Sequence, residues 1–172
     1  DRDELIEAFE WIEDEIAEVY AKNLFVRDGT NYFFNLGKLK KRNTQLSGPA
    51  GIIKKYLPKV NGIEKVFTKQ EILDADTTDK IIRRMKNMIH PERSPDVLAL
   101  VSSGNIYRSP YGTGHGTPYD YDTHVPLLFS RKNRPKRQVS DHVATVDIAP
   151  TIGHILSIPI PDSVDGKILK IE

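Results

Sequence analysis

The feature that most constrains the fold is a continuous apolar run, DVLALVSS, at residues 96–103. Its apolar residues follow one another without the alternation of a half-exposed strand, which indicates a strand buried on both faces. The segment VPLLFS (Val125–Ser130) has the same character. Such strands lie in the middle of an α/β sheet that needs several parallel strands and helices on both faces. The sequence therefore predicts an α/β fold with part of its sheet missing from this chain.

Composition narrows the class of protein. Hydrophobic residues make up 38% and charged residues 28% of the 172 positions, which is typical of a globular domain. A net charge of +1 does not favour nucleic acid or an acidic lipid surface as a partner, and no apolar run approaches the roughly 20 residues of a membrane span. The chain has no cysteine, so histidine, aspartate and glutamate are the metal ligands open to it.

Three regions follow from the apolar spacing. Residues 1–23 form an amphipathic helix, residues 24–95 an α+β region with a helix start capped by Thr68 and Glu71, and residues 96–172 part of an α/β core. Within the last region, VATVDIAPTIGHIL predicts a strand followed by a helix with Asp147 as its N-cap. Because the chain starts at Asp1, already inside a helical pattern, we expect it to be a piece of a longer protein.

The segment YGTGHGTPYDYDTHVPLLFS (Tyr111–Ser130) holds the candidate site residues. Glycines flank His115, so its backbone can adopt a positive φ and approach a ligand closely. Its imidazole is a good zinc ligand if Asp120 or Asp122 accepts its second ring proton. The alternative is a turn histidine that hydrogen-bonds within its own loop. His124 is open to three roles: ligand, base, or a structural brace of the loop.

Other patterns in the sequence give weaker indications of a functional site. The chain contains neither a nucleophile elbow nor a phosphate-cradling loop of the Walker type. The basic segment RKNRPKR (Arg131–Arg137) is either a solvated loop or a contact for an anionic partner. His90 and His154 are interpreted as structural, and His142, beside Asp141, as a weak site candidate.

Two stretches in order carry a resemblance to a known family: GTGHGTPYDYDTHVPLLF and, after it, VATVDIAPTIGHIL. They resemble the C-terminal part of the alkaline phosphatase superfamily, in particular phosphate-irrepressible alkaline phosphatases and type I phosphodiesterase/nucleotide pyrophosphatases. Upstream, NYFFNL, IEKVFT and TKQEIL resemble the family's insert between the sheet halves. The resemblance implies a partial alkaline-phosphatase-like α/β sheet sandwiched by helices, with an α+β insert.

The function implied by the resemblance is hydrolysis of phosphate monoesters or diesters with two zinc ions and a Thr or Ser that forms a phospho-enzyme. One metal in such enzymes activates the attacking hydroxyl and the other stabilises the leaving oxygen. His115 matches a zinc ligand of the family, and His124 matches a recurrent residue of its loop. Asp120, Asp122 and His124 are the residues that could brace this loop or orient His115. The family's nucleophile and its other ligands lie N-terminal to the region that this chain covers.

No catalytic residue is therefore expected in this chain, and we expect the chain alone to be inactive. Its implied partners are a phosphate-ester substrate and the missing N-terminal part of the same protein, with no nucleic-acid-specific site and no membrane span. The resemblance also implies a periplasmic or secreted protein. The competing interpretation is a stand-alone binding module or degenerate homologue, with the acidic first helix and Arg131–Arg137 as its partner surfaces.

Overall fold

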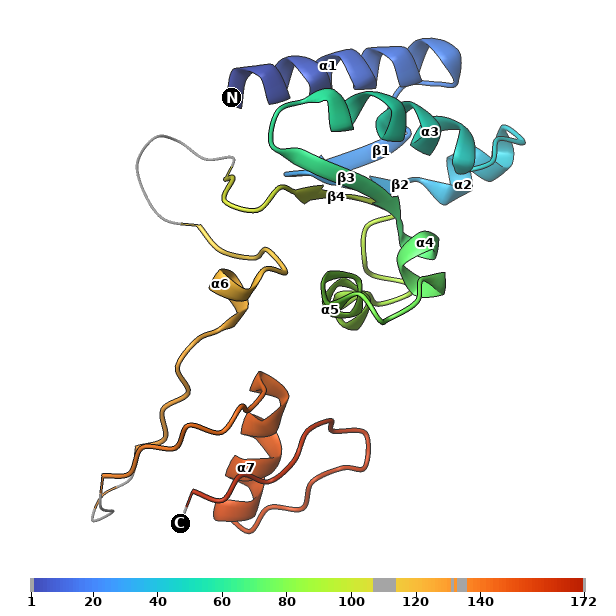
Figure 1. Ribbon diagram of the computed structural model, residues 1–172. Coiled ribbons are helices and arrows are strands. Elements are labelled where there is room, and N and C mark those ends of the chain that lie inside the picture. Colours follow the sequence, from blue (N-terminus) through green and yellow to red (C-terminus); the bar gives the residue numbers. More distant parts are fainter. Residues whose placement is uncertain (1, 107–113, 131, 133–135, 172) are drawn as a thin grey trace. The chain divides into compact units, whose positions relative to one another are not determined.

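A computed structural model of the chain describes residues 2–106, 114–130, 132 and 136–171 (Figure 1). The chain divides into two compact units, Asp1–His124 and Val125–Glu172, and each is described by itself. No helix among the described residues is long and apolar enough to cross a membrane.

The first unit is built on a four-stranded sheet in the order β1-β2-β4-β3, in which every neighbouring pair is antiparallel. A tight hairpin joins the first two strands through Gly29 and Thr30, and Gly29 has the positive φ of +56° that such a loop requires. The central strand β4 pairs with β2 on one side and β3 on the other. The strands are β1 (Phe25–Asp28), β2 (Asn31–Phe34), β3 (Ile63–Thr68) and β4 (Val97–Val101).

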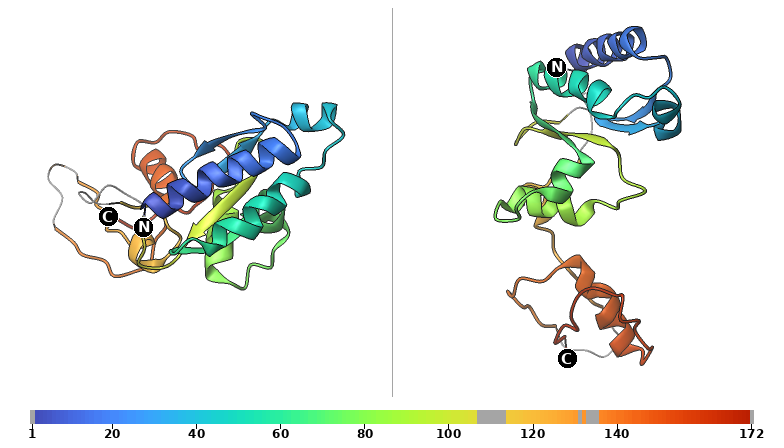
Figure 2. Two further views of the ribbon diagram at one scale, coloured as in Figure 1. Left: turned by 90° about the horizontal axis from the view of Figure 1, so that it is seen from above. Right: turned by 90° about the vertical axis from the view of Figure 1, so that its right-hand side faces the viewer.

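Helices cover both faces of this sheet (Figures 1 and 2). On one face, α1 (Arg2–Val19) lies beside α3 (Ser47–Tyr56), which continues into the 3-10 turn η1 (Leu57–Lys59). On the other face, α4 (Lys69–Asp74) and α5 (Lys80–Met88) enclose a second, smaller apolar cluster. A short helix not predicted from the sequence, α2 (Leu36–Lys41), follows β2 and is capped by the side chain of Asn35.

The β4 strand confirms that the DVLALV run is a strand buried from both sides. Val97 belongs to the apolar cluster beneath α1 and α3, whereas Leu100 belongs to the cluster beneath α4 and α5. Burial on both faces is usual for parallel strands, which is why the sequence predicted a parallel sheet. That prediction is wrong for this unit, because every strand pair is antiparallel. An antiparallel strand reaches the same burial here because helices cover both faces of the sheet.

Two helix predictions hold in detail. In α1, the predicted apolar face buries Leu5, Phe9, Ile12 and Ile16, although Val19 at its end remains exposed. The start of α4 carries the predicted capping box: the Thr68 hydroxyl accepts a hydrogen bond from the Glu71 amide, and the Glu71 carboxylate accepts one from the Thr68 amide.

Tyr32 in β2 is 1% exposed, and its hydroxyl has no hydrogen-bond partner among the described residues. An unpaired buried hydroxyl carries a desolvation cost of about 1–3 kcal/mol. We therefore expect Tyr32→Phe to leave the free energy of unfolding unchanged or to raise it by up to about 1 kcal/mol. Urea unfolding followed by fluorescence of Trp11 measures this.

A matched control is Tyr119→Phe, because the Tyr119 hydroxyl lies 2.8 Å from the carbonyl oxygen of Val101. That variant is expected to lose about 1 kcal/mol. A loss of stability in Tyr32→Phe as large as that of Tyr119→Phe would contradict the prediction.

The second unit contains the 3-10 turn η2 (Thr145–Asp147) and α7 (Ile148–Ile155). Asp147 directly precedes the helix as predicted, but its carboxylate does not cap it. Instead the carboxylate accepts hydrogen bonds from the amides of Ala144 (2.9 Å) and Lys167 (2.9 Å), which hold its pKa below the usual range. The Thr151 hydroxyl donates to the Asp147 carbonyl and accepts from the Leu169 amide, so both residues tie the C-terminal tail to α7.

Neither strand predicted for the last third of the chain is formed. Val125–Ser130 pairs with no strand in the described part of the chain, and Leu128 is 87% exposed. In the VATV segment before Asp147, Val143 and Ala144 pair with no described strand, and Thr145 and Val146 already belong to the 3-10 turn η2. A strand exists only when a neighbouring strand completes its backbone hydrogen bonds, and no described segment does so here.

The predicted boundary at residue 96 also differs from the division into units at residue 124, because β4 belongs to the sheet of the first unit.

Candidate functional site

The loop that carries His115 follows the exposed end of β4 and ends in the single-turn helix α6 (Asp120–Thr123). Residues 111–113 of the predicted motif lie outside the described residues. The described loop, 114–124, falls within the first unit, so its contacts with the sheet and with α5 are defined.

Two tyrosines hold this loop to the end of β4. The Tyr119 hydroxyl lies 2.8 Å from the carbonyl oxygen of Val101 and 2.6 Å from Oε2 of Glu64. Desolvation and, after it, the Glu64 carboxylate raise the pKa of Tyr119, which keeps the hydroxyl a hydrogen-bond donor. Tyr121 stacks on Tyr119 with ring centroids 5.7 Å apart, and its hydroxyl accepts a hydrogen bond from the Gly104 amide at 3.1 Å.

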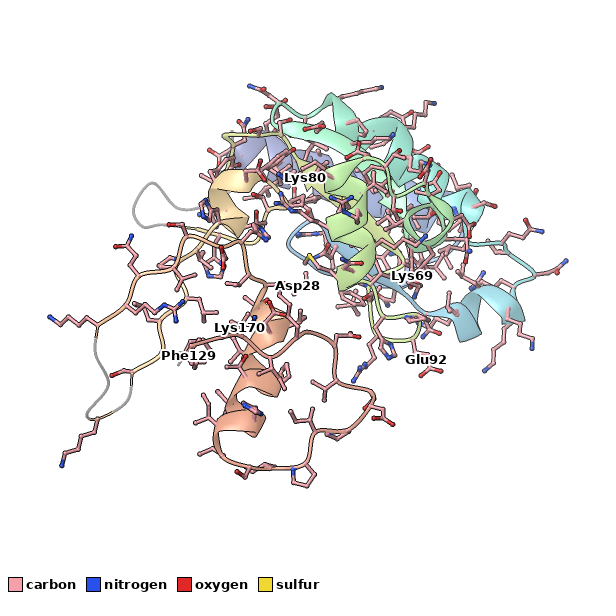
Figure 3. The ribbon with its side chains drawn as sticks, turned by 60° about the horizontal axis from the view of Figure 1, so that its bottom comes forward. Asp28, Lys69, Lys80, Glu92, Phe129 and Lys170 are labelled. Carbon is pink, nitrogen blue, oxygen red and sulfur yellow. The ribbon has the colours of Figure 1, made fainter. Side chains whose placement is uncertain are left out.

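A pair of basic residues on α5 holds the other side of the loop. Lys80, labelled in Figure 3, and Arg84 both contact the carboxylate of Asp120, with nitrogen–oxygen distances of 2.6 and 2.8 Å. The hydrogen bonds from Lys80 and Arg84 lower the pKa of Asp120. Arg84 also donates to the carbonyl oxygen of Pro118 at 2.7 Å, and Pro118 is buried. Asp120 therefore binds the loop to α5.

Asp122 fixes the turn immediately after His115. Its Oδ2 accepts hydrogen bonds from the amide (2.7 Å) and the hydroxyl (2.8 Å) of Thr117. These bonds lower the pKa of Asp122, with a smaller contribution from the charge of His115. The turn favours a glycine at position 116 because its φ is +112°, a conformation that other residues rarely adopt. The reason is the backbone conformation and not a lack of space, since a Cβ there would meet no neighbouring atom. Of the residues predicted to orient His115, Asp122 is thus the one whose carboxylate interacts electrostatically with it.

His115 itself is exposed, and no described residue hydrogen-bonds its imidazole. The side chain of His124 is also exposed, whereas its amide donates to the Asp120 carbonyl and ends α6. A free imidazole can serve as one ligand of a metal ion. The described residues, however, contain no group of three or more histidine, aspartate or glutamate side chains that could hold such an ion. The described part of the chain thus has an exposed imidazole at His115 and no complete metal site.

Sequence reasoning missed the residues that position the loop: Arg84, Lys80, Tyr119 and Glu64. Lys80 and Arg84 are four residues apart and so share one helix face, which was a signal for a common anionic partner. Nothing local in the sequence connects that face to Asp120, 40 residues from Lys80. His142 is near enough to Asp147 to contribute weakly to its lowered pKa. Of the basic segment Arg131–Arg137, residues 131 and 133–135 lie outside the described residues.

The chain is similar to several alkaline phosphatases. Alkaline phosphatase PhoK of a Sphingomonas species is 31% identical over 129 residues, which are 68% of this chain and 23% of that protein. Alkaline phosphatase PafA of Elizabethkingia meningoseptica is 28% identical over 138 residues, which are 78% of this chain and 25% of that protein. The chain therefore spans about a quarter of the length of these curated relatives. No protein-family model matches the chain.

The fold agrees with the sequence matches. The crystal structure of wild-type alkaline phosphatase PafA superposes on 93% of this chain and 31% of that chain, with a TM-score of 0.78 and 23% identity. The fold class is thus the mixed α/β fold of that enzyme, here as a four-stranded antiparallel sheet flanked by helices. Over the matched part of its length, this chain is related to the alkaline phosphatase superfamily.

Proposed function

We propose that this chain is the C-terminal part of a zinc-dependent phosphohydrolase that cleaves phosphate monoesters or diesters through a Thr or Ser phospho-enzyme. Two observations carry the proposal: the match to alkaline phosphatases over about a quarter of their length, and an exposed histidine on a loop that is anchored to β4 and α5. By family resemblance the whole protein is periplasmic or secreted.

In this proposal His115 supplies one zinc ligand, and the nucleophile and the other ligands come from the preceding part of the protein. Three features of the loop support the role. The imidazole is exposed and forms no hydrogen bond with a described residue, Gly116 gives the backbone its turn, and Asp122 places a negative charge nearby. Asp122 then orients the loop through Thr117, while the amide of His124 ends α6.

The apolar segment Val125–Ser130 supports the same proposal. It is extended, and the side chains of Val125 and Leu128 are exposed, as expected of a strand whose neighbours belong to another part of the protein. We propose that it completes its backbone hydrogen bonds against strands of the preceding part.

A side-by-side assay of the full-length protein and the 172-residue chain tests this function. Zinc content is measured by mass spectrometry of the metal, and activity with a chromogenic phosphate monoester and diester. We expect activity and bound zinc in the full-length protein, and neither in the chain. A native product of 19.5 kDa in the source cells, free of zinc and of activity, would contradict the proposal and favour a binding module.

A further inference from the structure

The loop that carries His115 rests on α5 through one residue in particular. NH1 of Arg84 is 2.7 Å from the Pro118 carbonyl oxygen and 2.8 Å from Oδ1 of Asp120. Pro118 is three residues after His115, and Asp120 begins α6. Arg84 therefore fixes the path of the backbone between the histidine and the helix that follows it.

Arg84 is better suited to this than Lys80, which contacts the same carboxylate. The side chain of Arg84 is 26% exposed and that of Lys80 is 51% exposed, so the Lys80 ion pair is the more strongly screened by water. Lys80 also makes no bond to the loop backbone among the described residues. A guanidinium can serve a carbonyl and a carboxylate together because its N–H groups lie in a rigid plane.

The helix that carries Arg84 is itself held in place. Asp79 caps its first turn by accepting hydrogen bonds from the amides of Ile81 and Ile82. Met85, next to Arg84, is buried in the apolar cluster beneath β4, and Lys86 donates to the Ala75 carbonyl. Through Arg84, the loop is thus tied to an element packed on the sheet, and its position does not depend on residues 114–117 alone.

We propose that Arg84 is a positioning residue for His115: it holds the loop 114–124 against α5 so that the imidazole is presented to a metal ion. This inference rests on the proposed function, in which His115 is a zinc ligand. Arg84 touches neither metal nor substrate and acts through Pro118 and Asp120. Residues that orient a metal ligand typically contribute about 10- to 100-fold to metal affinity.

The test uses the full-length protein with four variants: Arg84→Met, Arg84→Lys, Arg83→Met and His115→Ala. Arg83 is exposed on the same helix, and its side chain forms no hydrogen bond or ion pair with a described residue, so it is the matched control. Zinc affinity is measured by competition with a chromogenic chelator, and hydrogen exchange of residues 114–124 is followed in the metal-free protein. We expect Arg84→Met to weaken zinc binding by about tenfold or more and to speed exchange in the loop. Arg84→Lys should recover part of both, and Arg83→Met should change neither.

The outcomes separate the inference from the proposed function. If His115→Ala lowers zinc affinity while Arg84→Met behaves like Arg83→Met, the inference is overturned and the proposed function stands. If His115→Ala binds zinc as the wild type does, the proposed function fails, and the role of Arg84 fails with it. Should Arg84→Met not fold, Asp120→Asn carries the test, because that carboxylate is 69% exposed and its loss spares the core. Wild-type zinc affinity and exchange in Asp120→Asn would then overturn the inference.

Discussion

His115→Ala in the full-length protein is expected to lower zinc content and to reduce phosphatase activity by more than about 100-fold. Loss of a residue that only orients a ligand costs up to about 100-fold in affinity or activity, and loss of the ligand itself removes a direct bond to the metal. The exposed imidazole is free of hydrogen bonds with described residues, so alanine leaves the loop contacts of Tyr119 and Asp122 intact. The fold should therefore persist while the metal is lost.

His124→Ala is the matched control, since it removes a second exposed imidazole from the same loop. We expect it to keep its zinc, because the proposal assigns the ligand to His115 and the backbone amide of His124, which ends α6, is unaffected by the substitution. The measurement is the metal-to-protein ratio, followed by kcat and KM for a phosphate ester. Unchanged zinc stoichiometry in His115→Ala would end the assignment of a ligand to this position.

Asp96→Ala is expected to destabilise the first unit by about 3–5 kcal/mol, the range for breaking a buried ion pair by removing one partner. Asp96 precedes β4 and is 7% exposed. Its Oδ2 accepts a hydrogen bond from the Phe34 amide at 2.8 Å, and its Oδ1 is 3.1 Å from Nζ of Lys69. Alanine would leave a buried N–H and a largely buried ammonium group without this carboxylate, and both connect β4 to its neighbours.

Urea unfolding of the 172-residue chain, followed by Trp11 fluorescence, measures the effect on the first unit. Trp11 is the single tryptophan and lies in α1, against Tyr56 of α3. Asp96→Asn should fall between wild type and Asp96→Ala, because its amide oxygen can still accept from Phe34. Asp28→Ala, at the exposed end of β1, should change the free energy of unfolding by less than about 0.5 kcal/mol. Equal stability of Asp96→Ala and Asp28→Ala would show that the carboxylate contributes nothing.

Local signals were sufficient to predict several elements of the fold. The spacing of Leu5, Phe9, Ile12 and Ile16 predicts α1, and the Thr68–Glu71 pair predicts the start of α4. The antiparallel order β1-β2-β4-β3 could not be predicted in this way, because it depends on pairings between strands far apart in the chain, such as Asn31 of β2 with Leu98 of β4. The apolar pattern of Val125–Ser130 predicts a strand that the structure does not form, because a strand needs a pairing partner and the pattern cannot supply one.

For the candidate site, the sequence pointed to the loop but not to its supports. Histidine between two glycines is visible in the sequence, and so is the nearby Asp122 that fixes the Thr117 turn. The sequence did not predict that Lys80 and Arg84 of α5 both contact the carboxylate of Asp120. Such a contact depends on tertiary packing, and a helix face with two basic residues does not specify its partner.

The strand order also determines when the first unit can fold during synthesis. Because β4 lies between β2 and β3, those two strands cannot pair with each other, and each awaits a neighbour that the ribosome makes later. The β1–β2 hairpin and the α1 and α3 helices can form early, yet the sheet closes only after residue 101 has emerged. Until then, nascent chains expose two open strand edges, which are templates for aggregation. The emergence of Val97–Val101 is therefore the step that commits the first unit to its fold.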